Sequence, residues 1–189
     1  MNKQWLVGFI EGEGCFNISF VKQAGSKFGY QPKATFIIKL TQSERAVIEQ
    51  IRGFLGGIGN IYNESSESTR RRGLKNARDC VSIRVTKLDE LLEIIEFLKN
   101  ESFISEQKRR DFEKWARCVQ LLKEKKHFSK EGFVEIARLR EQMHTMVHVK
   151  KKGFCELRNL VDPCEVYAKN KNTLRTCNSC MIPTEVMVK

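Results

Sequence analysis

The order of hydrophobic and polar residues changes its period several times along the chain. Apolar residues spaced by about 3.6 positions indicate helices, and strict alternation of apolar and polar residues indicates half-buried strands. The glycine pair at 56 and 57 ends one of the helices. The predicted elements, in chain order, are a helix at 4–14, strands at 15–23 and 33–40, a helix at 41–57, strands at 58–62 and 80–85, and helices at 86–100, 105–126 and 129–143.

This order of elements predicts an α+β domain with a four-stranded antiparallel sheet whose helices cover one face. In the strand at 80–85, Val81, Ile83 and Val85 point to the covered face, so the residues between them point to the other. The uncovered face is therefore predicted to be polar and basic, with Asn17, Ser19, Thr35, Lys39, Ser82 and Arg84. Such a face suits nucleic acid, and a sheet face that is merely solvated is the simpler alternative.

The charge of the chain favours a polyanionic partner. The 189 residues include 34 Lys and Arg against 23 Asp and Glu, so the formal net charge is +11, an excess typical of proteins that bind nucleic acid. No run of about 18 apolar residues is present, and acids interrupt the short apolar run near the start, so we expect no transmembrane helix, signal peptide or membrane partner. Seven cysteines, an odd number, indicate a reducing compartment.

The stretch LVGFIEGEG at residues 6–14 places glycines and glutamates inside a helical pattern. Gly8 and Gly12 are four residues apart and share one helix face, which lets a second helix approach closely. Glu13 lies at the predicted C-terminal end, where the helix dipole is negative, so a carboxylate there favours a hard divalent cation such as Mg²⁺. Packing of this face within the chain, with both glutamates solvated, is the alternative.

The same stretch resembles the signature of the LAGLIDADG homing endonucleases. Leu6, Gly8 and Gly14 are identical to that signature, and glutamate replaces its two aspartates. The later segments CFNISF, FIIKLTQ, LGGIGNIY and QKRRDF keep the order of the family, so the resemblance implies the αββαββα fold over roughly residues 4–143. It further implies a double-strand DNA endonuclease that is specific for a long site and encoded in an intron.

Individual site residues also follow from the resemblance. It implies that Glu13 binds the catalytic Mg²⁺ or Mn²⁺ and that Gly12 offers its backbone carbonyl. Gln42 occupies the place of a polar residue near the attacking water. Lys108 corresponds to a lysine that stabilises charge at the phosphate, and a solvated helix charge is the other interpretation of this residue. The alternatives for the lysine role are Lys99 and Arg45.

A single copy of the motif implies a homodimer built through the motif helix, and two-fold symmetry then predicts a palindromic or pseudo-palindromic site in double-stranded DNA. The uncovered sheet face and the basic loop after the third strand would contact bases and phosphates. The residues expected to bind DNA are Asn17, Ser19, Gln23, Lys39, Arg70, Arg71, Arg72, Lys75, Arg78, Ser82 and Arg84. An intron maturase that holds RNA, or a cleavage-inactive DNA-binding protein, is the alternative function, and retention of Glu13 favours the nuclease.

The resemblance does not extend over the C-terminal part of the chain. Residues 1–149 are predicted to form the endonuclease domain, and residues 150–189 a basic extension. One cysteine pair in the extension has the two-residue spacing of a zinc knuckle, so a structural Zn²⁺ site and uncoordinated thiols both remain open. The cysteines concerned are Cys155, Cys164, Cys177 and Cys180. The expected location is intracellular, in a mitochondrion, a chloroplast or a prokaryotic cytoplasm.

Overall fold

The structure is a computed structural model, and it describes residues 1–143 apart from the side chains of Ser68 and Thr69. The predicted C-terminal extension and its four cysteines lie outside the described residues. The helices are α1 (Lys3–Glu13), α2 (Arg45–Phe54), α3 (Glu67–Arg71), α4 (Leu88–Leu98), α5 (Glu106–Lys123) and α6 (Lys130–Glu141), with 3₁₀ turns η1 (Gln42–Glu44) and η2 (Lys126–Phe128). The strands are β1 (Gly14–Lys22), β2 (Tyr30–Thr41), β3 (Asn60–Glu64) and β4 (Cys80–Val85).

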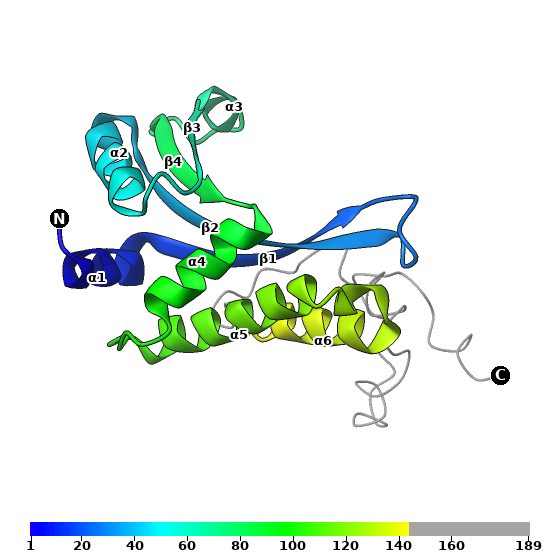
Figure 1. Ribbon diagram of the computed structural model, residues 1–189. Coiled ribbons are helices and arrows are strands. Elements are labelled where there is room, and N and C mark those ends of the chain that lie inside the picture. Colours follow the sequence, from blue (N-terminus) through cyan, green and yellow to red (C-terminus); the bar gives the residue numbers. More distant parts are fainter. Residues whose placement is uncertain (144–189) are drawn as a thin grey trace, which may run out of the picture.

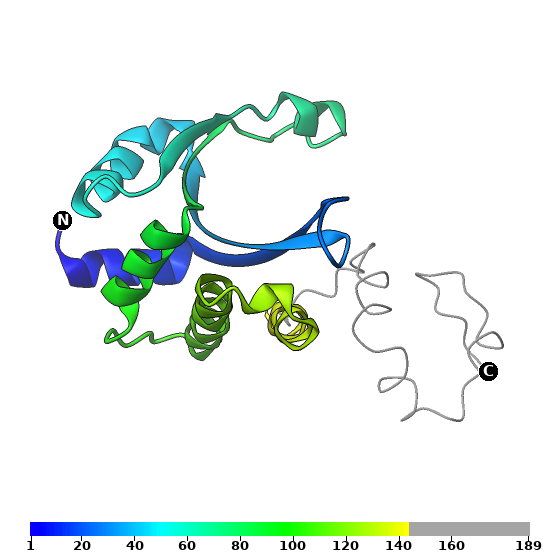
Figure 2. The same cartoon turned by 45° about the vertical axis from the view of Figure 1, so that its right-hand side comes forward.

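The four strands form one antiparallel sheet in the order β1-β2-β4-β3, so β2 and β4 are central. Phe16 of β1 lies opposite Phe36 of β2, and Ile38 of β2 lies opposite Ile83 of β4. Alternation along each strand places these buried side chains on one face. The sheet is curved, and the helices lie along its convex side (Figure 1, Figure 2). The predicted α+β fold with a four-stranded antiparallel sheet covered on one side is therefore confirmed.

Aromatic rings fill the layer between the sheet and α5. Trp115 is fully buried, and its ring centroid lies 5.1 Å from that of Phe16 and 6.4 Å from that of Phe36. Phe112 adds a ring 5.4 Å from Phe16. Offset aromatic pairs of this kind add about 0.5–1.5 kcal/mol beyond the burial of their area. This packing holds α5 against β1 and β2, and it fixes where the first turn of α5 lies.

β2 and β3 each continue beyond their hydrophobic pattern at one end. β2 begins at Tyr30 because this residue pairs with Lys22, and β3 continues to Glu64 because this residue pairs with Cys80. The segment predicted as a plain loop at 63–79 also contains the short helix α3. Backbone pairing, which does not depend on apolar side chains, explains the two strand extensions. Among the described residues, no helix is both long and apolar enough to cross a membrane.

Candidate functional site

The end of α1 leads directly into β1 and leaves Glu13 at the surface. At the start of the helix, Asn2 Oδ1 accepts a hydrogen bond from the N–H of Trp5 at 2.8 Å. At its end, the N–H of Gly14 donates to the carbonyl of Ile10. A Cβ at residue 14 would lie 2.6 Å from that oxygen, so only glycine permits this close exit. The turn therefore presents an exposed carboxylate at the negative end of the helix dipole.

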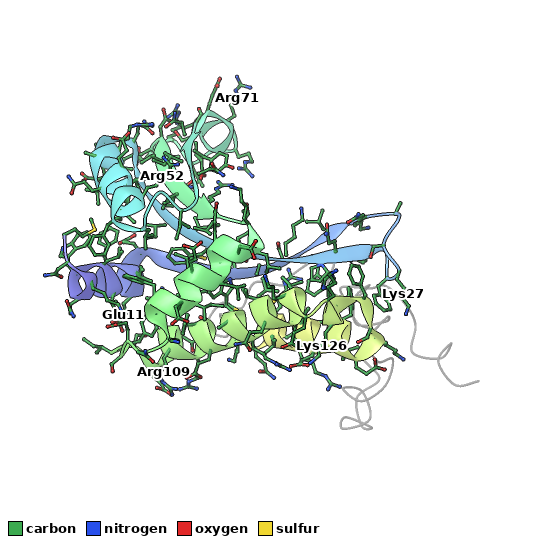
Figure 3. The ribbon with its side chains drawn as sticks, viewed as in Figure 1. Glu11, Lys27, Arg52, Arg71, Arg109 and Lys126 are labelled. Carbon is green, nitrogen blue, oxygen red and sulfur yellow. The ribbon has the colours of Figure 1, made fainter. Side chains whose placement is uncertain are left out.

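The two glutamates of the motif have separate roles. Glu11 Oε1 accepts a hydrogen bond from the backbone N–H of Ser105, which is the N-cap residue of α5. A carboxylate is favourable at this position, where the dipole of α5 is positive. Figure 3 shows Glu11 below α1, toward the start of α5. Glu11 therefore docks one helix on the other, whereas Glu13 is exposed and available to a ligand.

Lys108 is a predicted catalytic residue that the fold brings to the motif. Its Nζ lies 2.6 Å from the carbonyl oxygen of Gly14, although the two residues are 94 positions apart in the chain. Ser105 Oγ accepts the N–H of Lys108 at 3.2 Å and so orders the turn from which this side chain extends. The junction of α1 and β1 thus combines an exposed carboxylate with an ammonium group from α5.

The other basic candidates and Gln42 have different partners. Gln42 begins η1 directly after β2, and its Nε2 donates to Asn63 Oδ1 at 3.3 Å. Arg45 Nη1 donates to the same oxygen at 2.7 Å, and Lys99 pairs with Glu96 at 2.6 Å. Of these four side chains, Lys108 contacts the motif segment within the described residues. Gln42 is instead hydrogen-bonded to β3.

The uncovered side of the sheet, here called the open face, lies inside the curve visible in Figure 2. The register shows that the predicted polar residues share this face: Asn17 is opposite Thr35, with Nδ2 and Oγ1 3.3 Å apart, and Ser82 is opposite Lys39. The open face therefore matches the prediction from alternation. Its side chains are those of Cys15, Asn17, Ser19, Val21, Gln31, Lys33, Thr35, Ile37, Lys39, Thr41, Asn60, Tyr62, Glu64, Cys80, Ser82 and Arg84.

Glu64 is an acid on the open face that the sequence pattern assigns to a loop. Its Oε2 accepts a hydrogen bond from Lys39 Nζ at 2.6 Å, and its Oε1 accepts one from the Ser82 hydroxyl at 2.7 Å and another from Arg84 Nη2. The hydrogen bond from Lys39, with those from Ser82 and Arg84, lowers the pKa of the Glu64 carboxyl to about 2. The group is therefore a carboxylate at neutral pH. The alternating polar residues at 60, 62 and 64 are the sequence signal that could have identified it.

Ser82, a predicted base contact, is buried in the structure. Its exposed fraction is 0%, because Glu64 and Arg84 cover it. Arg84 Nε donates to Ser82 Oγ at 3.2 Å, so the hydroxyl supports its neighbours on the open face. Alternation assigns Ser82 to the correct face, but it carries no information on which side chains lie above it.

Two extensions flank the open face. The first is the tip of the β1–β2 hairpin, where the N–H of Gln23 donates to the carbonyl of Gly29 at 2.9 Å. The second is the segment 65–79, which contains α3. Figure 3 shows Lys27 at the end of the first extension and Arg71 at the outer end of the second. The two extensions therefore place basic side chains beyond both ends of the open face.

Asp79 organises the second extension. Its Oδ1 accepts hydrogen bonds from the N–H and the hydroxyl of Ser66 at 2.8 and 2.6 Å, and Arg70 Nη1 lies 3.5 Å away. The hydrogen bonds from Ser66, together with Arg70, hold the pKa of Asp79 below its usual value. The basic residues predicted to contact DNA here are all exposed: Arg70, Arg71, Arg72, Lys75 and Arg78.

The outer face of α1 is partly apolar and carries no side chain at two positions. Trp5 is 45% exposed, and it stacks on Phe9 with ring centroids 4.9 Å apart. A Cβ at Gly8 or at Gly12 would meet no atom within 4 Å. Within residues 1–143, close packing therefore does not explain the two glycines.

The fold and this site define an α+β protein with an open polar sheet face and an exposed carboxylate at the end of a glycine-bearing helix. The family model described as LAGLIDADG endonuclease matches residues 6–119, which is more than half of the chain. The chain belongs to the LAGLIDADG endonuclease family. The resemblance found in the motif at residues 6–14 is therefore confirmed.

Curated relatives are similar over a part of their length. Probable intron-encoded endonuclease 3 of Neurospora crassa is 28% identical over 137 residues, which are 72% of this chain and 24% of that protein. Probable intron-encoded endonuclease Cox1-I1b of Schizosaccharomyces pombe is 40% identical over 84 residues, which are 40% of this chain and 21% of that protein. The chain thus spans about a quarter of the length of these relatives.

Two solved structures show the same fold. The homing endonuclease I-TnaI superposes with a TM-score of 0.69 at 25% identity, covering 85% of this chain and 98% of that one. The LAGLIDADG homing endonuclease I-SmaMI bound to cleaved DNA has a TM-score of 0.71 at 20% identity, covering 96% of this chain and 53% of that one. The chain is therefore similar to almost the whole of I-TnaI and to about half of I-SmaMI.

Proposed function

We propose that this chain is a site-specific homing endonuclease, encoded in an intron, that makes a metal-dependent double-strand break in a long pseudo-palindromic DNA site. The observation that carries the proposal is the junction of α1 and β1, where Glu13 is exposed and the Lys108 ammonium contacts Gly14. A carboxylate and an ammonium group beside a polar, basic sheet face suit hydrolysis of a DNA phosphodiester. Membership in an endonuclease family supports the same function.

The acting form in this proposal is a homodimer in which the outer faces of two α1 helices pack together. The bare positions at Gly8 and Gly12 permit close approach, and the exposed ring of Trp5 adds apolar area. The fold of this chain covers 98% of the I-TnaI chain but 53% of the I-SmaMI chain. This difference supports a homodimer in which each copy of the chain supplies one half of a two-fold arrangement. Symmetry would bring the two copies of Glu13 together, and it predicts a pseudo-palindromic site.

The end of α1 fits a hard divalent cation, Mg²⁺ or Mn²⁺. Glu13 offers an exposed carboxylate, and Gly12 belongs to the last helical turn, whose carbonyls lack partners within the helix. Residues 1–143 contain no cluster of three His, Cys, Asp or Glu side chains that could hold a metal. In the proposed site the remaining ligands of the cation come from the second copy of the chain, the DNA phosphate and water. A bound cation stabilises charge on the phosphate and activates water.

The side chains of the chain have distinct parts in this reaction. Lys108 places a positive charge beside the scissile phosphate and stabilises the charge that develops there. Gln42, held by Asn63, orients the attacking water. The buried Ser82 is left out of the DNA-contacting set. Base contacts come from Asn17, Ser19, Gln23, Lys39 and Arg84, and phosphate contacts from Arg70, Arg71, Arg72, Lys75 and Arg78.

A selection from a random library of double-stranded DNA tests this function. Ca²⁺ is used in the selection because it is expected to permit binding and to slow cleavage. We expect a pseudo-palindrome to be enriched, and both of its strands to be cut when Mg²⁺ replaces Ca²⁺ but not when EDTA is added. Enrichment without cutting would favour the cleavage-inactive or maturase alternative, and structured intron RNA would then be tested. A failure to enrich any sequence would contradict the proposal.

Lys108→Met is expected to slow cleavage of the enriched site about 10²–10³-fold, as found when one group that stabilises a transition-state charge is removed. The affinity for uncut DNA should fall by less than about threefold, because one of many positive charges is lost. Single-turnover cleavage and fluorescence anisotropy measure the two effects. Lys99→Met removes the same charge from the end of α4 and is the matched control. Equal cleavage rates in both variants would contradict the role of Lys108.

A further inference from the structure

The open face carries one acid among its basic side chains, and in the proposed function this acid faces DNA. Glu64 lies on the edge strand β3, and its carboxylate reaches across β4 to Lys39 of β2. A carboxylate here repels phosphates, so it weakens the general attraction between DNA and a chain of net charge +11. General affinity for DNA therefore does not explain Glu64.

The Glu64 carboxylate helps to fix the guanidinium of Arg84 in one place. Glu64 Oε1 accepts hydrogen bonds from Arg84 Nη2 and from the Ser82 hydroxyl, and Arg84 Nε donates to that same hydroxyl at 3.2 Å. The Tyr62 ring supports the guanidinium as well, since its centroid lies 5.3 Å from the guanidinium carbon. The side chains of Glu64 and Arg84 are 24% and 39% exposed, so the pair is accessible from the open face but not fully solvated.

An arginine held in this way keeps donors for a ligand. The guanidinium carries five N–H donors. Within the described part of the chain, the hydrogen bond to Ser82 uses the donor on Nε and the hydrogen bond to Glu64 uses one donor on Nη2. Bidentate donation to O6 and N7 of guanine requires two further donors in the plane of the group. Because Arg84 is oriented before DNA arrives, binding removes less of its rotamer freedom.

The same carboxylate limits the contacts that Lys39 and Arg84 can make with phosphates. Both cations have a near partner in Glu64, and a phosphate that approached them would also approach this negative charge. A base edge carries no net charge, so it meets no such repulsion. The arrangement of these charges therefore favours contacts with bases over contacts with phosphates.

We propose that Glu64 is a positioning residue for DNA specificity, which holds Arg84 and Lys39 toward base edges and away from phosphates. The inference rests on the proposed function, because it concerns the same DNA-binding face. It predicts that at least one base pair of the target site is read through Arg84 and that guanine is preferred there.

The test compares base preferences in the Ca²⁺ selection for the wild-type chain and a set of variants. Arg84→Lys first identifies the base pairs whose preference depends on Arg84. Glu64→Gln then removes the central charge while it keeps the shape of the side chain. Glu67→Gln is the matched control, because it removes the same charge from the exposed helix α3, where the partner of Glu67 is Arg71.

We expect Glu64→Gln to reduce base preference about tenfold at the pairs that Arg84→Lys identifies, and to leave the other pairs unchanged. Glu67→Gln should keep every preference, although both variants should bind random DNA more tightly. Adding Glu64→Gln to Arg84→Lys should cause no further loss at those pairs, a result that a merely structural role would not produce. Tyr62→Leu, at an exposed position, should reproduce the loss and serves as the second variant if Glu64→Gln does not fold.

Identical preference profiles for Glu64→Gln and Glu67→Gln would overturn this inference and leave the proposed function intact. A loss spread evenly over all base pairs would overturn it as well, because Glu64 would then not act through Arg84. If the wild-type chain enriched no sequence, the proposed function itself would fail, and the inference would fail with it.

Discussion

Glu13→Gln is expected to reduce double-strand cleavage of the selected site by about 10³-fold or more, because it removes the charge that would hold the cation beside the phosphate. Glutamine has nearly the same shape as glutamate, and the side chain is exposed, so the fold should be retained. Binding in EDTA should be unchanged or slightly tighter, since one negative charge near the phosphates is lost. Single-turnover cleavage in Mg²⁺ and anisotropy in EDTA measure the two effects separately.

Glu11→Gln makes the same substitution two positions earlier and is the control. Glutamine keeps an oxygen that can accept from the N–H of Ser105 but removes the negative charge at the start of α5, so the free energy of unfolding should fall by no more than about 1 kcal/mol. Cleavage by the folded variant should stay close to that of the wild type. Equal cleavage rates in the two variants would contradict the assignment of Glu13 as the metal ligand.

Gly8→Leu is expected to abolish dimer formation and to weaken binding to the full DNA site about 10²–10⁴-fold, the range gained when two linked modules bind together. Within residues 1–143 a Cβ at this position meets nothing within 4 Å, so the fold should tolerate the substitution. The helix itself should gain about 0.8 kcal/mol, because leucine is a far better helix former than glycine. Analytical ultracentrifugation, thermal unfolding and anisotropy on full and half sites measure these effects.

Gln120→Leu adds the same apolar side chain at an exposed position on α5 and controls for surface hydrophobicity. We expect this variant to remain dimeric and to cut the full site. A Gly8→Leu protein that remained dimeric and bound the full site as the wild type does would exclude α1 as the dimer interface. The proposed homodimer would then require a different surface.

Much of the α1–β1 junction follows from residues 6–14 alone. The helix was expected at residues 4–14 and lies at Lys3–Glu13, and the strand begins immediately afterwards at Gly14. The period of the hydrophobic residues, the spacing of the glycines and the position of an acid relative to a helix end are local properties. A sequence pattern can therefore indicate them. The same reasoning explains why the polar face of the sheet, including Asn17, Thr35 and Lys39, was assigned correctly.

The central cluster of the open face shows what such reasoning misses. The hydrophobic pattern places Glu64 in a loop because β3 contains few apolar residues, yet backbone pairing opposite Cys80 extends the strand to this position. Alternation predicts that Ser82 faces the open side, and in the structure two neighbouring side chains bury it there. Both features escape the pattern because pairing partners and covering side chains come from other strands.

Local patterns in the amino-acid sequence are enough to indicate the family, the order of elements, the polar face of the sheet and the acid at the end of α1, because these depend on residues close together in the chain. Only the tertiary structure brought Lys108 to Gly14, Glu11 to Ser105 and Glu64 to Lys39. The first two contacts depend on how the aromatic core packs α5 on the sheet. The third depends on the strand order β2-β4-β3, which places β3 and β2 on opposite sides of β4. Long-range packing and register, rather than local pattern, therefore assemble the candidate site.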